Sequence, residues 1–393
     1  MILPLLLPAL AAEPAVPAVS AAPGSGVTVA SGDGRFSLTL RGRVQLRELV
    51  SVPAAEAGGS AEPELQTQLS TARLWLGGHL LSEHTRWVLQ LAVAQRDFRD
   101  GATSPVFDAY FDFTQNPNLM VRVGQAFVPF DRLRTIREFA LQLPDRPRVI
   151  SEFALDRDLG VVVGSDRLGG ADSVVAYRLG VFGGSGIHQL DARPPGGLFV
   201  GRVEVRPLGP IDDDSEGDLA RRTAPGLALG VAGAFNHGSA RARGTTSTVY
   251  ELGTTDYTHA AADAVFKWRG LAVEAEWILR EASVDHIDGV DEAGVAAVEY
   301  TRSGWGVVTQ ASYMVAPQVE VAARYARLGA FDGTDPTLLA TVAEQPNEAT
   351  VGANLYLNGH KFKVQAGAST FFGDRASLDR AEWGGSLLVD ATF

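Results

Sequence analysis

Arginines gather in the stretch GQAFVPFDRLRTIREFALQLPDRPR, residues 124–148, where three prolines interrupt an otherwise alternating sequence. A guanidinium keeps its charge at physiological pH and presents a planar fork of N–H donors that matches the oxygens of carboxylates and phosphates. Several residues of this type in one short stretch favour a site that contacts anions. The candidates are Arg132, Arg134, Arg137, Arg146, Arg148, Asp131 and Glu138.

The acidic residues of this region support a second interpretation. Arg134 and Glu138 are spaced i,i+4, which is the spacing of an ion pair on a helix. Some arginines then brace the segment instead of contacting a solute, and this role is favoured for Arg146 and for Arg157 next to Asp158. The sequence leaves both roles open for the set.

The rest of the chain alternates between apolar and polar residues with a period of two, as half-exposed strands do. In FSLTLRGRVQLR, one face carries Phe36, Leu38 and Leu40, and the opposite face carries polar side chains. Arginines on such polar faces extend the candidate cationic surface along the predicted strands. They are Arg41, Arg43, Arg47, Arg73 and Arg122.

The alternation predicts sixteen strands, which is an even number. Their expected ranges are 36–50, 65–81, 85–97, 106–116, 119–127, 158–168, 173–182, 197–207, 225–236, 257–268, 271–283, 304–315, 318–328, 347–357, 361–371 and 381–393. Short connections such as 82–84, 116–118 and 358–360 alternate with longer polar ones, and the long connection at 208–224 is the exception. Short turns on one rim and long loops on the other are typical of outer-membrane barrels.

A soluble barrel also alternates, with its apolar residues inward, so the period alone does not separate the two kinds of protein. Strands of about ten residues match the length that a tilted strand needs to cross the hydrocarbon layer. Together with an export-type N-terminus, these features predict an all-β fold. It is a transmembrane antiparallel β-barrel of about 16 strands in the bacterial outer membrane, with lipid against its apolar face.

The arginine-rich stretch falls between the fifth and sixth predicted strands. A connection of about 30 residues inside a compact barrel is more often a functional insertion than slack. Pro129 ends the strand ladder because it has no N–H, and Asp131 is a candidate N-cap for a short helix. Leu133, Ile136 and Ala140 then share one face of this helix, which we expect to dock on the barrel wall and leave the arginines facing water.

Several motifs resemble one family. GQAFVPF, Asp145-Arg146, Glu152-Phe153 and RDLG (157–160) resemble the pattern that follows the fifth strand of the phosphate-selective porins O and P. The strand sequences RFSLTLRGRVQ, ARYARL and NLYLN are also similar to that family, so the resemblance runs from about residue 34 to the end. It implies a sixteen-stranded, trimeric outer-membrane porin whose third extracellular loop, here the arginine-rich stretch, folds inward and narrows the channel.

The C-terminal sequence GGSLLVDATF alternates and ends on Phe393. It resembles the last strand of bacterial outer-membrane barrels, in which a terminal Phe is part of the signal read by the barrel assembly machinery. The alternative is a soluble edge strand that ends on Phe by chance. The resemblance therefore implies the assembly machinery as a partner, beside outer-membrane lipid.

The amino-acid composition bears on which ions the predicted channel would carry. Nearly all positive charge is arginine, because lysine occurs only as Lys267, Lys361 and Lys363. The phosphate members of the family use a lysine-containing cluster, so phosphate specificity stays open while anion preference or general porin activity is retained. The net charge of −12 argues against a nucleic-acid partner. It leaves the sign of ion selectivity open, since acids far from the narrowest part are screened.

Three segments are expected along the chain: an export signal at 1–11, a flexible lead-in without core at 12–33, and the barrel at 34–393. The missing Lys or Arg near Met1 indicates a misplaced or truncated start. There is no Cys, so neither a disulfide nor a thiolate metal site is expected. IDDDSEGD (211–218) imitates a calcium loop, but Thr223 stands where a bidentate Glu is needed, which predicts a solvated acidic turn without metal.

Three classes of function fit these patterns. The leading hypothesis is a porin for passive diffusion of small hydrophilic solutes, with a preference for phosphate or other small anions, with no enzymatic activity and no cofactor. The second is a barrel-embedded hydrolase such as a phospholipase or protease, in which a Ser with a nearby His, or an Asp–His pair, converges on the outer rim. Its candidate histidines are His188, His237, His259 and His286. The third is an adhesion or structural barrel with a closed lumen.

Overall fold

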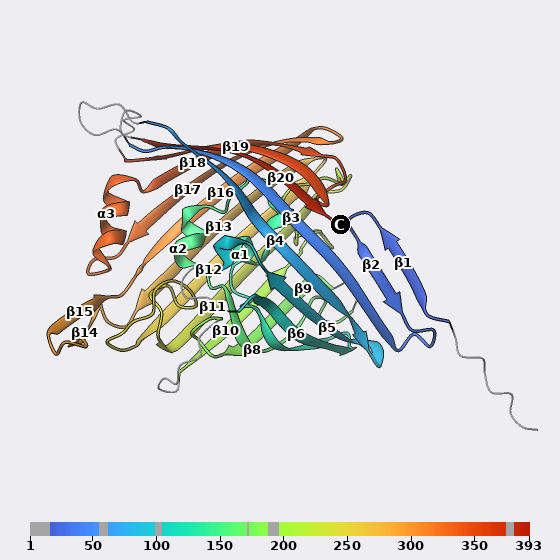
Figure 1. The fold of residues 1–393 in the computed structure, drawn as a ribbon, viewed down its shortest axis with the longest axis horizontal. Coiled ribbons are helices and arrows are strands. Elements are labelled where there is room, and N and C mark those ends of the chain that lie inside the picture. Colours follow the sequence, from blue (N-terminus) through green and yellow to red (C-terminus); the bar gives the residue numbers. More distant parts are fainter. Residues whose placement is uncertain (1–15, 55–61, 99–103, 171–172, 188–195, 375–380) are drawn as a thin grey trace, which may run out of the picture.

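The computed structural model describes residues 16–54, 62–98, 104–170, 173–187, 196–374 and 381–393. Its main sheet holds eighteen strands, of which β1 and β2 form an N-terminal hairpin and the other sixteen close a barrel (Figure 1). The barrel strands are β3 (Phe36–Val52), β4 (Glu64–Leu80), β5 (Ser82–Ala92), β6 (Val106–Asn116), β7 (Leu119–Phe127), β8 (Arg157–Ser165), β9 (Val175–Phe182), β10 (Gly197–Val205), β11 (Gly226–Ser239), β12 (Thr255–Trp268), β13 (Leu271–Ala282), β16 (Gly304–Ala316), β17 (Val319–Ala330), β18 (Asn347–Tyr356), β19 (Phe362–Phe372) and β20 (Glu382–Thr392). These sixteen confirm the predicted strands. Within the described ranges, no helix is long and apolar enough to cross a membrane.

The barrel closes where the last strand meets the first. β20 pairs antiparallel with β3, with Asp390 opposite Gln45. Arg43, two residues away on β3, donates from Nε and Nη2 to the two Asp390 oxygens over 2.9 and 2.7 Å. A bidentate pair of this kind fixes geometry as well as charge, so it secures the seam of the barrel.

Apolar side chains face outward and polar ones face the bore. Val231 and Val351 are 60% and 59% exposed, whereas Glu320, Lys363 and Asp390 are fully buried. This is the reverse of a soluble barrel, whose apolar face is inside. A closed barrel with such an exterior satisfies its backbone internally and meets lipid with apolar side chains. The protein is accordingly a bacterial outer-membrane barrel.

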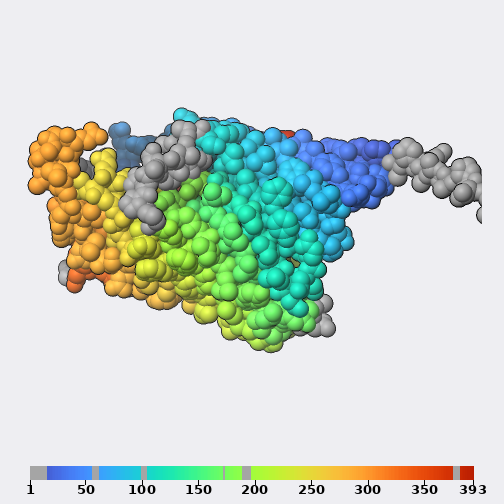
Figure 2. Space-filling model, turned by 90° about the horizontal axis from the view of Figure 1, so that it is seen from below, coloured from blue at the N-terminus to red at the C-terminus, as the bar shows by residue number. Residues whose placement is uncertain are grey.

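The two rims differ, as the connection lengths predict. β4–β5, β6–β7, β12–β13 and β16–β17 are joined by tight turns on one rim, here called the short-turn rim. The opposite, long-loop rim carries the hairpin of β14 (His286–Val290) and β15 (Ala296–Tyr300), and α3 (Pro336–Glu344). Figure 2 shows that the N-terminal hairpin, in blue, and the β14–β15 hairpin, in orange, project from opposite ends of the outer wall.

The expectation of a flexible lead-in at 12–33 was wrong for its described part. β1 (Ala18–Ala22) and β2 (Gly26–Ala30) form a hairpin, and β2 pairs with β3 from Ser37 to Leu40. The physical reason is that β20 reaches β3 only as far as Arg43, which leaves the first residues of β3 with an unpaired edge. The export signal expected at 1–11 lies outside the described residues.

Candidate functional site

The connection between β7 and β8, residues 128–156, crosses the bore, and we call it the inner loop. It holds α1 (Arg132–Thr135), the 3-10 turn η2 (Glu138–Ala140) and α2 (Arg148–Phe153), and Figure 1 shows α1 and α2 within the ring of strands. On one side of the bore, Arg137 pairs with Asp108 of β6 at 3.1 Å. On the other side, Gln142 Nε2 donates to Glu320 of β17 over 2.7 Å, and Lys363 of β19 donates to the Leu141 carbonyl over 2.7 Å.

The start of the inner loop folds largely as its sequence predicts. Asp131 caps α1, because its Oδ2 accepts a hydrogen bond of 2.9 Å from the backbone N–H of Arg134. Burial raises the pKa of the Asp131 carboxyl to about 7. Leu133 packs into a core cluster between the loop and the inner wall, whereas Ile136 and Ala140 belong to a separate small cluster. The loop is therefore docked by more apolar contacts than the single predicted stripe.

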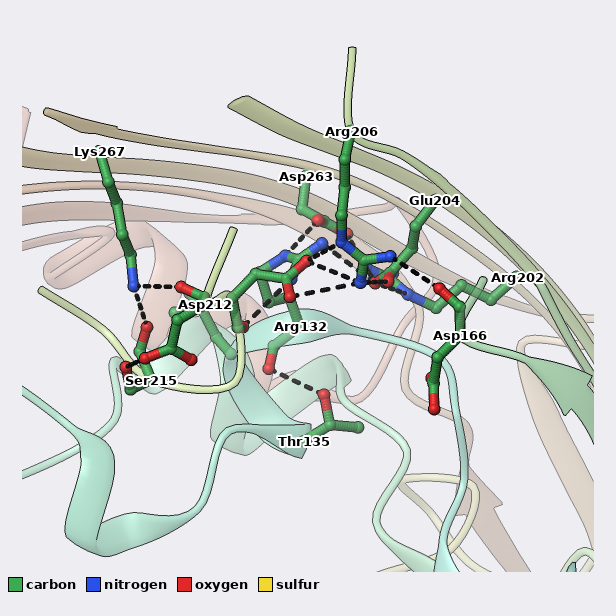
Figure 3. Close-up of polar contacts among 12 residues, drawn as sticks. Arg132, Thr135, Asp166, Arg202, Glu204, Arg206, Asp212, Ser215, Asp263 and Lys267 are labelled. Carbon is green, nitrogen blue, oxygen red and sulfur yellow. Dashed lines mark hydrogen bonds and ion pairs between the residues drawn. The ribbon is translucent and has the colours of Figure 1, made fainter. Parts of the chain in front are cut away.

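Arg132 is a buried hub and does not face open solvent. Its Nε donates to Asp263 of β12 over 2.6 Å, its Nη2 donates to Glu204 of β10 over 3.0 Å, and its Nη1 lies 3.2 Å from Asp213 (Figure 3). Only 5% of its side chain is exposed. Three carboxylates engage its donors, so a direct anion-contacting role, expected from the sequence, does not fit this geometry.

The connection between β10 and β11, residues 206–225, enters the bore from the short-turn rim, and we call it the short-rim segment. Lys267 of β12 donates to the carbonyls of Asp212 and Ser215 over 2.6 Å each (Figure 3). Asp213 and Glu216 are buried. The expectation of a solvated acidic turn at 211–218 was therefore wrong for these two acids, because arginines pair with Asp213 and the inner loop donates to Glu216. Asp212 and Asp214 are exposed, as expected. In the described residues, no group of three His, Asp or Glu side chains is arranged to hold a metal.

A cavity of about 350 Å³ lies between the inner loop and the inner faces of β3 to β7, and we call it the cationic cavity. Glu138 is the only acidic residue in its described lining. Burial opposes the charged form of Glu138, yet Arg96, Arg43 and Arg146 together hold the pKa of its carboxyl well below the usual range. The cations that line this cavity are Arg41, Arg43, Arg73, Arg134, Arg137, Arg146, Arg157 and Lys361.

A second cavity, of about 850 Å³, adjoins the first. The two share Tyr110, Phe127, Arg137, Phe139 and His360, which together form a neck between them. The second cavity reaches the short-rim segment and is lined by acids as well as by arginines, including Arg122. The strongly cationic part of the water-accessible interior is thus the side bounded by β3 to β7 and the inner loop.

The structure separates the predicted residues into two groups. Arg41, Arg43, Arg73, Arg134, Arg137, Arg146 and Glu138 line the cationic cavity, and Arg122 lines the second. Arg148 lines neither cavity, since its guanidinium stacks 3.4 Å from the centre of the Phe371 ring and donates to Gln345. Arg47 pairs with Asp145 of the inner loop and is 8% exposed.

Arg146 braces the inner loop, which is the role expected for it from the sequence. Its Nε donates to the Leu133 carbonyl over 2.9 Å, and its Nη2 donates to the Ile136 carbonyl over 2.5 Å. Burial, followed by the nearby guanidinium of Arg134, lowers the pKa of Arg146 to about 10. The guanidinium stays protonated at neutral pH, so it closes the inner loop on itself while one side of it lines the cationic cavity.

Sequence reasoning missed the contribution of aromatic residues. Arg157 lies 3.6 Å from the ring centre of Phe127 and 3.7 Å from that of Phe107, and Arg41 lies 3.8 Å from that of Trp75. All three rings line the cationic cavity. The alternation of the sequence places Trp75 on the same face of β4 as Arg73. It does not indicate the other two rings, because Phe127 is an odd number of residues from Arg122 and the strand of Phe107 contains no arginine.

The histidines proposed for a hydrolase are not arranged as Ser–His pairs in the described part of the chain. His237 lies 2.9 Å from Asp256, and His286 lies 3.4 Å from Asp288. His259 is buried against Phe130 and Tyr257, with neither ring nitrogen hydrogen-bonded. His188 lies outside the described residues. Two of the candidates thus form Asp–His pairs, but among the described residues none of these histidines has a Ser hydroxyl as a hydrogen-bond partner, which is what activation of a serine nucleophile needs.

The chain matches no protein-family model and no curated protein sequence. Its fold is similar to that of the outer membrane channel DcaP of Acinetobacter baumannii, with a TM-score of 0.53, 13% identity, and coverage of 91% of this chain and 97% of DcaP. It is also similar to OmpF of Salmonella typhi, with a TM-score of 0.54, 11% identity, and coverage of 91% and 98%. OprB of Pseudomonas putida matches with a TM-score of 0.53, 9% identity, and coverage of 91% and 94%.

These neighbours are outer-membrane porins, and the fold of this chain is a porin-type barrel. Identities of this size show the fold alone. Membership in the phosphate-selective porins O and P therefore stays a prediction.

Proposed function

We propose that this protein is an outer-membrane porin that lets small hydrophilic solutes diffuse passively, with a preference for anions. One observation carries the proposal: among the described residues, eight cationic side chains and a single acidic one line the cationic cavity. Charged groups in a narrow passage with low-dielectric walls raise the local concentration of ions of opposite sign and lower the cost of their partial dehydration. Carboxylates behind the lining, such as Asp390, Asp97 and Asp108, pair with some of these arginines and offset part of their charge, whereas acids farther away on the barrel are screened.

The inner loop is the constriction in this proposal. It narrows the bore between β6 and β17, and Arg134 and Arg137 are the loop arginines that reach the cationic cavity with about a quarter and a third of their side chains exposed. Arg41, Arg43 and Arg73 continue the cationic path along β3 and β4. In this arrangement the long-loop rim is extracellular, and the short-rim segment approaches the loop from the periplasmic side.

The positions of the lysines bear on whether the channel prefers phosphate over other anions. Lys267 and Lys363 are buried and donate to backbone carbonyls, so they clamp the short-rim segment and the inner loop. Only Lys361 lines the cationic cavity. Without a lysine cluster at the constriction, we propose a preference for anions in general, with phosphate as one permeant ion among several.

Assembly completes the proposal. Phe393 exchanges backbone hydrogen bonds with Gly42 of β3 over 2.8 and 2.9 Å, which places the terminal residue at the barrel seam. We propose that the assembly machinery reads this end and that the barrel forms a homotrimer through its outer wall. A mass of three chains for the detergent-solubilised protein supports the trimer, and a mass of one chain contradicts it.

Planar bilayer recording tests the channel function directly. Purified protein is inserted into a bilayer with a KCl gradient, and the reversal potential is read from the current–voltage curve. We expect the protein to conduct in symmetric KCl. In the KCl gradient, the sign of the reversal potential should show that chloride is more permeant than potassium. Absence of conductance, or a potassium-side reversal potential, would contradict the proposal.

A further inference from the structure

Aromatic rings and guanidiniums alternate around the cationic cavity. Its described lining includes Trp75, Phe107, Tyr110, Phe127 and Phe139. Guanidiniums lie over these rings, with the Arg73 and Arg122 carbons 4.6 and 4.1 Å from the ring centres of Phe107 and Tyr110. A guanidinium that stacks on a ring keeps its in-plane N–H donors free to point elsewhere. The wall therefore offers apolar ring surface beside cationic edges.

Arg41 is the least neutralised of these cations. Arg43 is held by both oxygens of Asp390, and Arg73 is paired with Asp97. Arg41 has no ion pair in the described part of the chain, and its buried Nε has no hydrogen-bond partner there. Its charge is thus available to a solute, next to the Trp75 ring on which it stacks.

We propose that the preferred solutes of this cavity are small aromatic carboxylates, an inference that rests on the proposed anion-preferring channel and narrows its solute class. Aromatic rings add no binding free energy for a small inorganic anion, because water and guanidinium N–H groups already supply its hydrogen bonds. An aromatic carboxylate buries its ring against the aromatic residues while its carboxylate accepts from Arg41 and Arg137. The volume of about 350 Å³ admits one such molecule.

Blockade of the chloride current by added anions tests this inference. Benzoate, cyclohexanecarboxylate, acetate and phosphate are added in turn to wild-type channels in KCl, and the concentration that halves the current is measured. We expect benzoate to act at a roughly tenfold lower concentration than acetate or phosphate, because ring contacts add to the shared charge contact. Cyclohexanecarboxylate should need more than benzoate, since it lacks a flat ring to stack.

Three variants separate ring recognition from charge recognition. In Trp75→Leu and Phe139→Leu, the half-blocking benzoate concentration should rise several-fold toward that of acetate, while the reversal potential in KCl stays on the chloride side. Trp383→Leu is the matched control, because Trp383 lies on the outside of β20 and is 42% exposed. It should leave benzoate block unchanged, and its KCl conductance shows that loss of one tryptophan permits folding.

Each outcome bears on a different claim. Equal block by benzoate and acetate in a chloride-preferring wild-type channel overturns the aromatic class and leaves the anion-preferring porin intact. Unchanged benzoate block in both Leu variants that still conduct KCl overturns the assigned rings. A wild-type channel that prefers potassium, or does not conduct, overturns the proposed function and this inference with it.

Discussion

The backbone N–H of Gln142 donates to Oε2 of Glu216 over 2.6 Å, and this bond joins two segments that enter the bore from opposite rims. The Glu216 N–H in turn donates to the Ala140 carbonyl over 3.1 Å. Gln142 belongs to the inner loop and Glu216 to the short-rim segment. Two joined connections therefore occupy the bore, of which the arginine-rich one alone was predicted from the sequence.

Shortening the short-rim segment should widen the path. Replacing residues 211–217 by a two-glycine turn removes Asp213 and Glu216 from the bore, and we expect single-channel conductance to rise by roughly half or more as the free cross-section grows. Current noise should also rise, because Gln142 loses a carboxylate partner. The matched control shortens the exposed β14–β15 hairpin on the long-loop rim, which should leave conductance unchanged.

Neutralising the cations of the cationic cavity should shift selectivity. In Arg41→Gln and Arg137→Gln, we expect the reversal potential in a KCl gradient to move by about 10 mV or more toward potassium. The effect of Arg137→Gln should be the larger, because it also releases the negative charge of Asp108 from one of its two arginine partners.

Arg148→Gln is the control for this series. It removes the same charge from the same loop, but Arg148 stacks on Phe371 and lines neither cavity. Its reversal potential should equal that of the wild type. An equal shift of the reversal potential in all three variants would show that these charges act at a distance, whether or not the side chain lines the cavity.

Glu152 should anchor the far end of the inner loop. Its carboxylate lies 2.7 Å from Arg280 Nη2, 2.9 Å from Arg302 Nε and 3.0 Å from Arg243 Nη2, and only 6% of it is exposed. Glu152→Gln leaves three guanidiniums around a neutral group, which we expect to cost about 3–5 kcal/mol. The folded band should be lost at a lower temperature on SDS gels, and trypsin should cut the loop faster.

Glu281→Gln is the comparison for the anchor. Glu281 is exposed and follows Arg280 on β13, so its change should move neither the gel transition nor the cleavage rate. Equal behaviour of the two variants would mean that the loop is held by its apolar contacts alone.

The sequence was sufficient for the barrel because alternation is a local property. Neighbouring residues such as Phe36 and Ser37 are enough to assign the two faces of a strand. Turns such as Arg269-Gly270, in which both residues adopt positive φ, mark where strands end. The docking of the inner loop is not local. Arg132 meets Asp263 across 131 positions of sequence, and nothing near either residue specifies that pairing.

The same limit explains the errors in the candidate site. Arg132, Arg137 and Arg148 look alike in sequence. Yet Arg132 is buried among acids, Arg137 lines the neck and Arg148 stacks on the Phe371 ring. Whether an arginine is available to a solute depends on the count of carboxylates around it, which only the closed barrel determines. Two acids of the run at 211–218 were misjudged because their partners Arg132 and Gln142 lie far away in the sequence.

Acidification should loosen the inner loop through Asp156. Burial opposes the charged form of this carboxyl, but Arg134 and Arg157 outweigh that cost and lower its pKa to about 2. A depressed pKa in the folded state means that Asp156 contributes stability above its ordinary pKa, near 3.8, and that this contribution is lost as pH falls toward 2. This contribution to the free energy of unfolding is about 2 kcal/mol, because the pKa falls from 3.8 to about 2 and each pH unit corresponds to about 1.36 kcal/mol.

Asp156→Asn tests this, because it removes the charge at every pH. We expect the variant to unfold more easily than the wild type at pH 7, by about 2 kcal/mol, and to lose less stability between pH 4 and pH 2. Some pH dependence should remain, since the pKa of Glu138 is also lowered by its arginines. Asp166→Asn is the control, because Asp166 is 72% exposed and pairs with Arg178 at the surface, where such pairs stabilise little. Urea unfolding at pH 7, 4 and 2 measures all three proteins, and parallel pH profiles for wild type and Asp156→Asn would rule out Asp156 as the titrating group.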